Sequence, residues 1–150
     1  MIPRHMVTHC LAANNKSSGF YANHHPGGGD WIHNSACGNR ANFNFLCRDF
    51  KANRDVPGFD HVISNNLGFQ GRAEVQNIDE TKCRLDGNLF GGELSKRDFV
   101  SLDTSELTAP RQADGSLPEI NFMRPKESGD FRKDPVPGAF ELSETNAGQR

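Results

Sequence analysis

The sequence has little of the material from which a compact hydrophobic core is usually built. Hydrophobic residues make up only 35% of its 150 residues, and the mean hydropathy is −0.68. No apolar run approaches the roughly 18 residues that cross a membrane, and residues 1–11 have no apolar segment of the kind that a signal peptide carries. We therefore expect neither a membrane span nor a simple globular core. The net charge of −2 likewise gives no reason to expect nucleic-acid binding.

Acidic residues are nearly absent from the first third of the chain. Up to Arg48 the only one is Asp30, and 18 of the 19 Asp and Glu residues follow later. The same segment holds five of the six histidines. Two explanations remain open. The segment forms a neutral-to-basic surface that suits an anionic ligand such as a polyuronate, or its polar loops simply carry few carboxylates.

The spacing of cysteines typical of zinc or redox sites is also missing. Cys10, Cys37, Cys47 and Cys83 include no CxxC pair and form no dense framework of the small secreted kind. Cysteine behaves as a small apolar residue in a core, so we expect buried free thiols. One or two disulfides are the alternative.

What the sequence does contain is an internal repeat. Residues 9–16 align with residues 33–40 at an offset of 24 positions, a third copy begins at His61, and a weaker fourth begins at Cys83. A period in the low twenties is typical of one coil of a parallel β-helix, in which short strands stack coil upon coil. Segments as short as Met6-Val7-Thr8 cannot bury a face alone, so the coils must support one another.

The alignment also predicts which residues stack. It places His9 on His33, and Asn15 on Asn39, with Asn65 or Asn66 next. Asparagine tolerates the left-handed backbone of a tight turn, and its amide bonds to copies above and below, so this column predicts an asparagine ladder. The same offset sets the pair Phe20-Tyr21 over Asn44-Phe45.

The chain divides into a solenoid and a tail. We expect residues 1–92 to form the last three to four coils, with a charged loop inserted at about 48–58. From residue 93 to 150 acidic residues and prolines become frequent, and a short helix is expected after an N-cap at Asp103 or Thr104. This mostly irregular extension should cover the last coil, because an open sheet edge is an aggregation hazard.

Five segments carry a resemblance to a known family. They are residues 9–25 (HCLAANNKSSGFYANHH), 31–45, 98–103, 107–118 and 136–141. As a set they resemble polysaccharide lyase family 9, the bacterial pectate and rhamnogalacturonan lyases. The resemblance implies a right-handed parallel β-helix from a monomeric enzyme, extracellular or periplasmic, that binds pectin or polygalacturonate and cleaves it by calcium-dependent β-elimination.

One departure from the family governs the expected activity. The family's catalytic lysine, in a Gly-Asn-Gly-Phe-Lys-like stretch, and its calcium-binding aspartates precede the position at which Met1 stands. They have no counterpart in these 150 residues. β-Elimination needs a base for the C5 proton and cations for the neighbouring carboxylate, and Asp30 alone cannot assemble a calcium site. We therefore expect no catalytic residue and no metal ligand here, and a C-terminal fragment that is inactive alone.

Five residues are candidates for contact with substrate. Lys16 and Arg40 fall on one face of adjacent coils, where each can pair with a uronate carboxylate. His24 and His25 precede a glycine-rich loop beside the expected groove and suit sugar hydroxyls or carboxylates, and Tyr21 can stack on a sugar ring. The alternatives are solvated charges at a turn, ordinary loop histidines and a core tyrosine.

Two other functions stay open at this stage. One is a non-catalytic β-helix module for carbohydrate binding or surface adhesion, and the other is a truncated product without function. A Gly-Phe-Lys segment and an aspartate cluster in the preceding gene sequence would favour the lyase over the binding module.

Overall fold

The computed structural model describes residues 2–92, 94–126 and 138–140. Its strands form three parallel sheets and one hairpin. Sheet A contains β1 (His5–Thr8), β4 (Gly29–Ile32), β9 (His61–Ser64) and β12 (Arg84–Asp86). Sheet B contains β2 (Leu11–Ala13), β5 (Ser35–Cys37), β10 (Leu67–Phe69) and β13 (Leu89–Phe90). Sheet C contains β3 (Ser18–Tyr21), β6 (Ala41–Asn44) and β11 (Ala73–Gln76).

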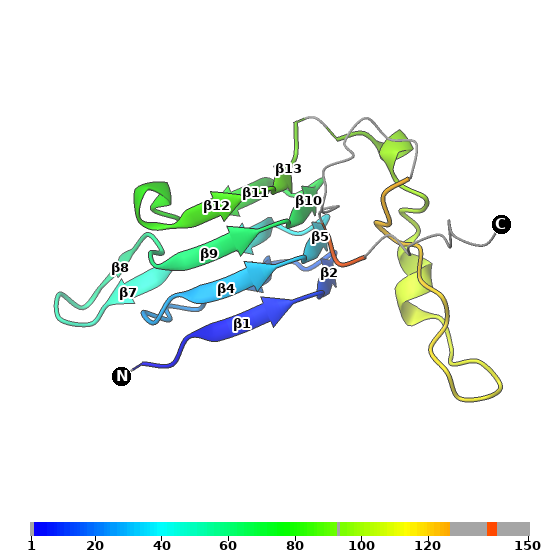
Figure 1. Ribbon diagram of the computed structural model, residues 1–150, viewed down its shortest axis with the longest axis horizontal. Coiled ribbons are helices and arrows are strands. Elements are labelled where there is room, and N and C mark those ends of the chain that lie inside the picture. The colour runs from blue at the N-terminus through cyan, green and yellow to red at the C-terminus, as the bar shows by residue number, and fades with distance from the viewer. Residues whose placement is uncertain (1, 93, 127–137, 141–150) are drawn as a thin grey trace, which may run out of the picture.

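The chain visits these sheets in a fixed order. It runs through a strand of A, then B, then C, and returns to A one level further on. Each strand pairs in parallel with its equivalent in the next coil, so the strands of a sheet lie side by side as steps of a stack (Figure 1). The predicted right-handed parallel β-helix is therefore confirmed.

The first predicted offset is confirmed at the corner between sheets A and B. Thr8 pairs with Ile32, and the following His9 and His33 rings stack with their centroids 5.2 Å apart. In sheet C the offset is one residue shorter, so Phe20 lies over Phe43 rather than over Asn44. The reason is local: four residues separate β2 from β3, but three separate β5 from β6.

The third coil is displaced by a larger insertion. His61 pairs with Gly29, an offset of 32 residues, so the third copy of the repeat does not continue the 24-residue offset. The extra length forms the antiparallel hairpin of β7 (Cys47–Asp49) and β8 (Arg54–Val56).

Rings and small residues fill the interior. Phe20 stacks on Phe43 at 5.1 Å, and the Trp31 and Phe45 rings meet edge to face at 5.5 Å. Ala36 of β5 is fully buried in the same cluster. Aromatic stacking across successive coils thus supplies the core that the low aliphatic content does not.

The predicted asparagine ladder exists, but as two ladders at different corners. At the corner between A and B, the Asn34 amide Nδ2 donates to Asn66 Oδ1 at 3.0 Å, and Asn66 Nδ2 donates to Asn88 Oδ1 at 2.9 Å. Asn66 therefore stacks on Asn34, and its predicted place above Asn39 is wrong. Each amide also reaches a backbone carbonyl of the preceding coil, so these buried groups are satisfied.

The second ladder lies at the corner between B and C. Asn15 Nδ2 donates to Asn39 Oδ1 at 2.9 Å, as predicted. The next coil has Gly71 at this position, and the Asn42 side chain fills the space, because a Cβ on Gly71 would lie 2.8 Å from Asn42 Nδ2. Asn39 Nδ2 donates to Asn42 Oδ1 at 2.8 Å, which extends the ladder by a residue of its own coil.

The described part of the tail packs on the outward face of sheet B. Phe99, Phe122 and Met123 are buried against outward-facing side chains of sheet B, among them Leu67 and Leu89. These side chains alternate along the strands with those that face the interior. These contacts run along the coils, whereas we expected the tail to lie over the last coil. Of the motif at 136–141, only residues 138–140 lie within the described residues.

Short 3₁₀ turns complete the described structure. They are η1 (Glu80–Lys82), η2 (Lys96–Asp98) and η3 (Thr104–Thr108). The predicted N-cap residue of η3 is Asp103, whose carboxylate accepts a hydrogen bond from Ser105 N at 2.9 Å.

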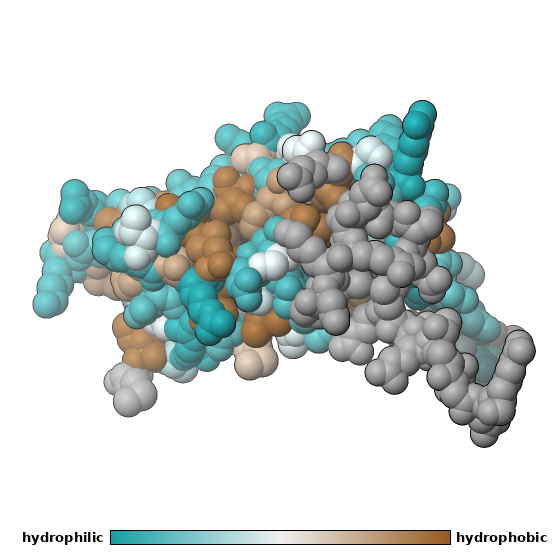
Figure 2. Space-filling model, turned by 45° about the horizontal axis from the view of Figure 1, so that its top comes forward, coloured by the Kyte–Doolittle hydropathy of each residue, from teal (hydrophilic) through white to brown (hydrophobic). Residues whose placement is uncertain are grey.

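Hydrophilic side chains cover much of the face shown in Figure 2, with hydrophobic ones gathered toward its middle.

All four cysteines are free, as expected, but they are not all buried. Cys37 and Cys47 are buried, Cys83 is half-buried, and Cys10 is exposed. Burial, with a smaller contribution from the carboxylate of Glu74, raises the pKa of Cys37 to about 11.

Candidate functional site

Three cations line one hollow at the corner between sheets B and C. Lys16, Arg40 and Arg72 each stand just before a strand of sheet C, in three successive coils. The hollow encloses about 370 Å³, and the asparagine and glutamine side chains of the same corner complete its lining. We call Lys16, Arg40 and Arg72 the cation row. The predicted grouping of Lys16 with Arg40 agrees with this arrangement, and Arg72 extends it.

The backbone fixes the order of the row. Arg40 N donates to Asn15 O, and Arg72 N donates to Asn39 O, both at 3.2 Å, so each member stands one coil beyond the previous one. Stacked parallel strands lie about 4.8 Å apart, and the cations therefore repeat at about that interval. All three side chains are exposed, and none forms an ion pair with another described residue.

Left-handed turn residues shape the hollow. Asn14, Gly38 and Gln70 occupy equivalent positions, with φ of 55°, 66° and 57°. A Cβ on Gly38 would lie 2.4 Å from Asn14 Oδ1, so glycine lets the Asn14 side chain lie against the next coil. The row thus lies beside turns that the second asparagine ladder joins from coil to coil.

A half-buried carboxylate ends that ladder. Glu74 Oε2 accepts from Asn42 Nδ2 at 2.5 Å, and Oε1 accepts from Gly71 N at 3.0 Å. Burial raises the pKa of Glu74 above its usual value, and the hydrogen bonds from Asn42 and Gly71 oppose that rise.

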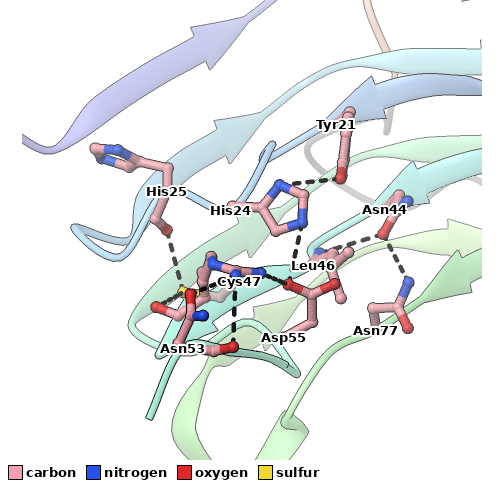
Figure 3. Close-up of polar contacts among 10 residues, drawn as sticks. Tyr21, His24, His25, Asn44, Leu46, Cys47, Asn53, Asp55 and Asn77 are labelled. Atoms are coloured by element: carbon pink, nitrogen blue, oxygen red, sulfur yellow. Dashed lines mark hydrogen bonds and ion pairs between the residues drawn. The ribbon is translucent and has the colours of Figure 1, made fainter. Parts of the chain in front are cut away.

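A second polar group lies at the other end of sheet C (Figure 3). The Tyr21 hydroxyl lies 3.4 Å from His24 Nδ1, and His24 Nε2 lies 3.4 Å from Asp55 Oδ1. Asp55 belongs to the inserted hairpin and also accepts from Arg48 at 2.7 Å. His24 adopts a left-handed φ of 64°, which turns its ring toward the hairpin.

His25 does not join this group. Its ring stacks on His5 with centroids 4.2 Å apart, and its Nε2 lies 2.8 Å from Pro3 O. The structure therefore separates the five predicted residues. Lys16 and Arg40 share the B–C corner, Tyr21 and His24 meet beyond the far end of β3, and His25 is committed to the N-terminal strand.

Two residues of these groups escaped the sequence analysis. Arg72 follows Arg40 by 32 positions rather than 24. Aligning the two requires the length of the hairpin insertion, which the repeat does not reveal. Asp55 lies 31 residues after His24 in the chain, and no local sequence pattern predicts an ion pair over that separation.

Calcium, which the family resemblance implies, can be tested against these residues. Calcium takes about six to eight oxygen ligands, several of them carboxylates. In the stretches that the structure describes, no three His, Cys, Asp or Glu side chains lie together in a way that could hold a metal ion. The described residues therefore do not fit calcium. Among them, too, no helix is long and apolar enough to span a bilayer.

Stacked parallel sheets with asparagine ladders at their corners define a parallel β-helix. No family model matches the chain. It is 35% identical over 123 residues to pectate lyase L of Dickeya chrysanthemi, across 82% of the chain and 27% of the relative. It is 30% identical over 125 residues to pectate lyase PEL9 of Emericella nidulans, across 82% and 28%.

Solved structures give the same result. The chain matches a rhamnogalacturonan lyase with a TM-score of 0.78 at 33% identity, over 85% of the chain and 32% of that protein. It matches the crystal structure of pectate lyase Pel9A with a TM-score of 0.67 at 30% identity, over 92% and 36%. The chain is therefore homologous to one part of the family 9 pectate lyases, and it spans about a quarter of the length of the curated relatives.

Proposed function

We propose that the chain is the part of a secreted pectate-type lyase that holds a polyuronate such as polygalacturonate. The cation row carries this proposal. A polyuronate bears one carboxylate on each sugar. Lys16, Arg40 and Arg72 present one cation on each of three successive coils, and none of them is paired with a carboxylate among the residues that the structure describes. An exposed ammonium or guanidinium pairs with a carboxylate without first breaking an internal ion pair.

The polar group beyond β3 extends the same surface. Tyr21 is 39% exposed and lies outward on sheet C, with its hydroxyl toward His24. In this proposal Tyr21 stacks on a sugar ring and His24 meets a hydroxyl or carboxylate, so the sugar chain crosses sheet C beyond the row. His25 is left out, because its ring face and its Nε2 are already engaged.

The proposal assigns binding to these residues and assigns the elimination chemistry elsewhere. Removal of the C5 proton and calcium binding belong to parts of the parent enzyme outside the 150 residues, so the isolated chain should bind without cleaving. The homology to pectate lyase L and PEL9 supports the substrate class.

The test is binding of the purified chain to polygalacturonate by affinity electrophoresis. Lys16→Ala, Arg40→Ala and Arg72→Ala should each weaken retention about two- to fivefold, as expected for exposed ion pairs. Added salt should weaken it further. Arg84→Ala is the matched control, because Arg84 is an exposed cation in β12, away from the row.

Two results would contradict the proposal. One is equal retention of the row variants and Arg84→Ala, since the effect would then be one of net charge. The other is equal retention by a neutral galactan. Unsaturated product, followed by its ultraviolet absorbance with calcium present, would contradict the assignment of elimination to other parts of the enzyme.

A further inference from the structure

The inserted hairpin forms one side of a second, larger hollow. It encloses about 520 Å³ between the hairpin and the neighbouring corner of the coils. Apolar side chains dominate its lining: Ile2, Pro26, Phe50, Val56, Pro57 and Phe59. We call this hollow the hairpin cleft. It shares no residue with the hollow of the cation row.

The Phe50 side chain in the wall of the cleft is unusually exposed for a phenylalanine, at 66%. Neither Phe50 nor Phe59 stacks on another ring among the described residues. Ring surface left open in a concave site is what an apolar ligand buries on binding.

Among the described residues, every charged side chain that lines the cleft has an ion-pair or hydrogen-bond partner, except Lys51. Arg48 pairs with Asp55 at 2.7 Å, and Lys82 pairs with Asp79 at 2.6 Å. The Asp49 carboxylate accepts from the backbone N–H groups of the tight turn that follows it, at 3.0 and 3.1 Å. The ammonium of Lys51 has no partner within the described part of the chain.

An uncompensated cation beside open rings defines the chemistry of the ligand. We propose that the hairpin cleft binds a small aromatic carboxylate, with its ring against Phe50 and Phe59 and its carboxylate on the Lys51 ammonium. The apolar side chains of the lining give a sugar's hydroxyls few hydrogen-bond partners, so the cleft favours an aromatic ring over a uronate. An uncharged aromatic ligand would leave Lys51 unused.

The test uses the full chain and cinnamate as the probe, followed by amide chemical shifts in nuclear magnetic resonance. The largest changes should fall on residues 48–59 and on Lys82. Lys51→Met keeps the apolar stem and removes the charge, and it should weaken cinnamate binding about tenfold. Phe50→Ala should weaken it by a similar factor. Both side chains are exposed, so neither variant should disturb the fold.

The controls separate this site from the cation row. Cinnamyl alcohol, which has the ring without the charge, should bind the unmodified chain about as weakly as cinnamate binds Lys51→Met. Lys16→Ala should bind cinnamate normally, so failure of the proposed polyuronate binding would leave this result unaffected. Equal binding of cinnamate and cinnamyl alcohol, shifts away from the hairpin, or preferential binding of galacturonate in the cleft would overturn the proposal. Concentration-dependent shifts of the hairpin without probe would also overturn it, because a second copy would then be the occupant.

Discussion

Replacing Asn66 with alanine tests the first asparagine ladder as a source of stability. Asn66 is fully buried, and its amide makes four hydrogen bonds. Its Oδ1 accepts from the N and Nδ2 of Asn34, and its Nδ2 donates to Trp31 O and Asn88 Oδ1. At about 0.5–1.5 kcal/mol each, these bonds predict a loss of about 2–6 kcal/mol in the free energy of unfolding.

The exposed end of the second ladder offers the matched comparison. The Asn15 side chain makes one ladder bond, to Asn39 Oδ1, and the backbone N–H of Asn15 still reaches that oxygen in an alanine variant. Asn15→Ala should therefore cost about 1 kcal/mol or less. The same chemical change at two ladder positions should differ several-fold in effect.

Urea denaturation followed by fluorescence measures both variants. Trp31 is the single tryptophan, it is buried, and it lies beside the first ladder, so its emission reports unfolding of the coils. If Asn66→Ala and Asn15→Ala lower the free energy of unfolding by the same amount, the ladder does not stabilise the coils in the way the hydrogen bonds indicate.

Further predictions concern titration, thiol reactivity and the turns. Burial lowers the pKa of His61 below the usual value of about 6.5. Below that pH the unfolded chain binds a proton that the folded chain does not, so the free energy of unfolding should fall as the pH drops. The urea midpoint should fall less steeply with pH in His61→Phe, and an unchanged slope would count against burial as the cause. Cys10 should react with a thiol reagent at pH 8 while Cys37 stays unmodified in the folded chain, which mass spectrometry of the labelled peptides would show. Gly38→Ala should destabilise the chain by about 1–2 kcal/mol in thermal unfolding, because its φ of 66° disfavours a Cβ; a stabilised variant would contradict the assigned turn.

The sequence predicted the parts of the fold that depend on like residues stacking on like residues. His9 on His33 and Asn15 on Asn39 follow from identity at one offset, and the structure confirms both. Beyond the hairpin the offset between coils changes, so residue identity alone no longer shows which residues stack. Asn66 resembles every other ladder asparagine, so its stacking on Asn34 could not be distinguished from stacking on Asn39.

The packing of the described part of the tail against sheet B was not predicted, for a different reason. Sheet B carries apolar residues on both faces, and Leu67 and Leu89 point outward although the core lies inward. This double-sided pattern was available in the sequence, but strands of three residues are too short for alternation to stand out. Similarly, Arg72 was overlooked because its register depends on the insertion, and Asp55 because its contact with His24 is long-range.

The corners of the solenoid differ in how much length they tolerate, and this has a practical use. Between sheets A and B every coil has the same two-residue connection, whereas between sheets C and A the connection runs from 22–28 in one coil to 45–60 in the next. The stacked asparagines hold the first corner to one length, while the hairpin is absorbed at the other without loss of register in β9. New loops for displaying peptides or catalytic groups should therefore be grafted at the C–A corner, where one coil of this chain already carries a hairpin.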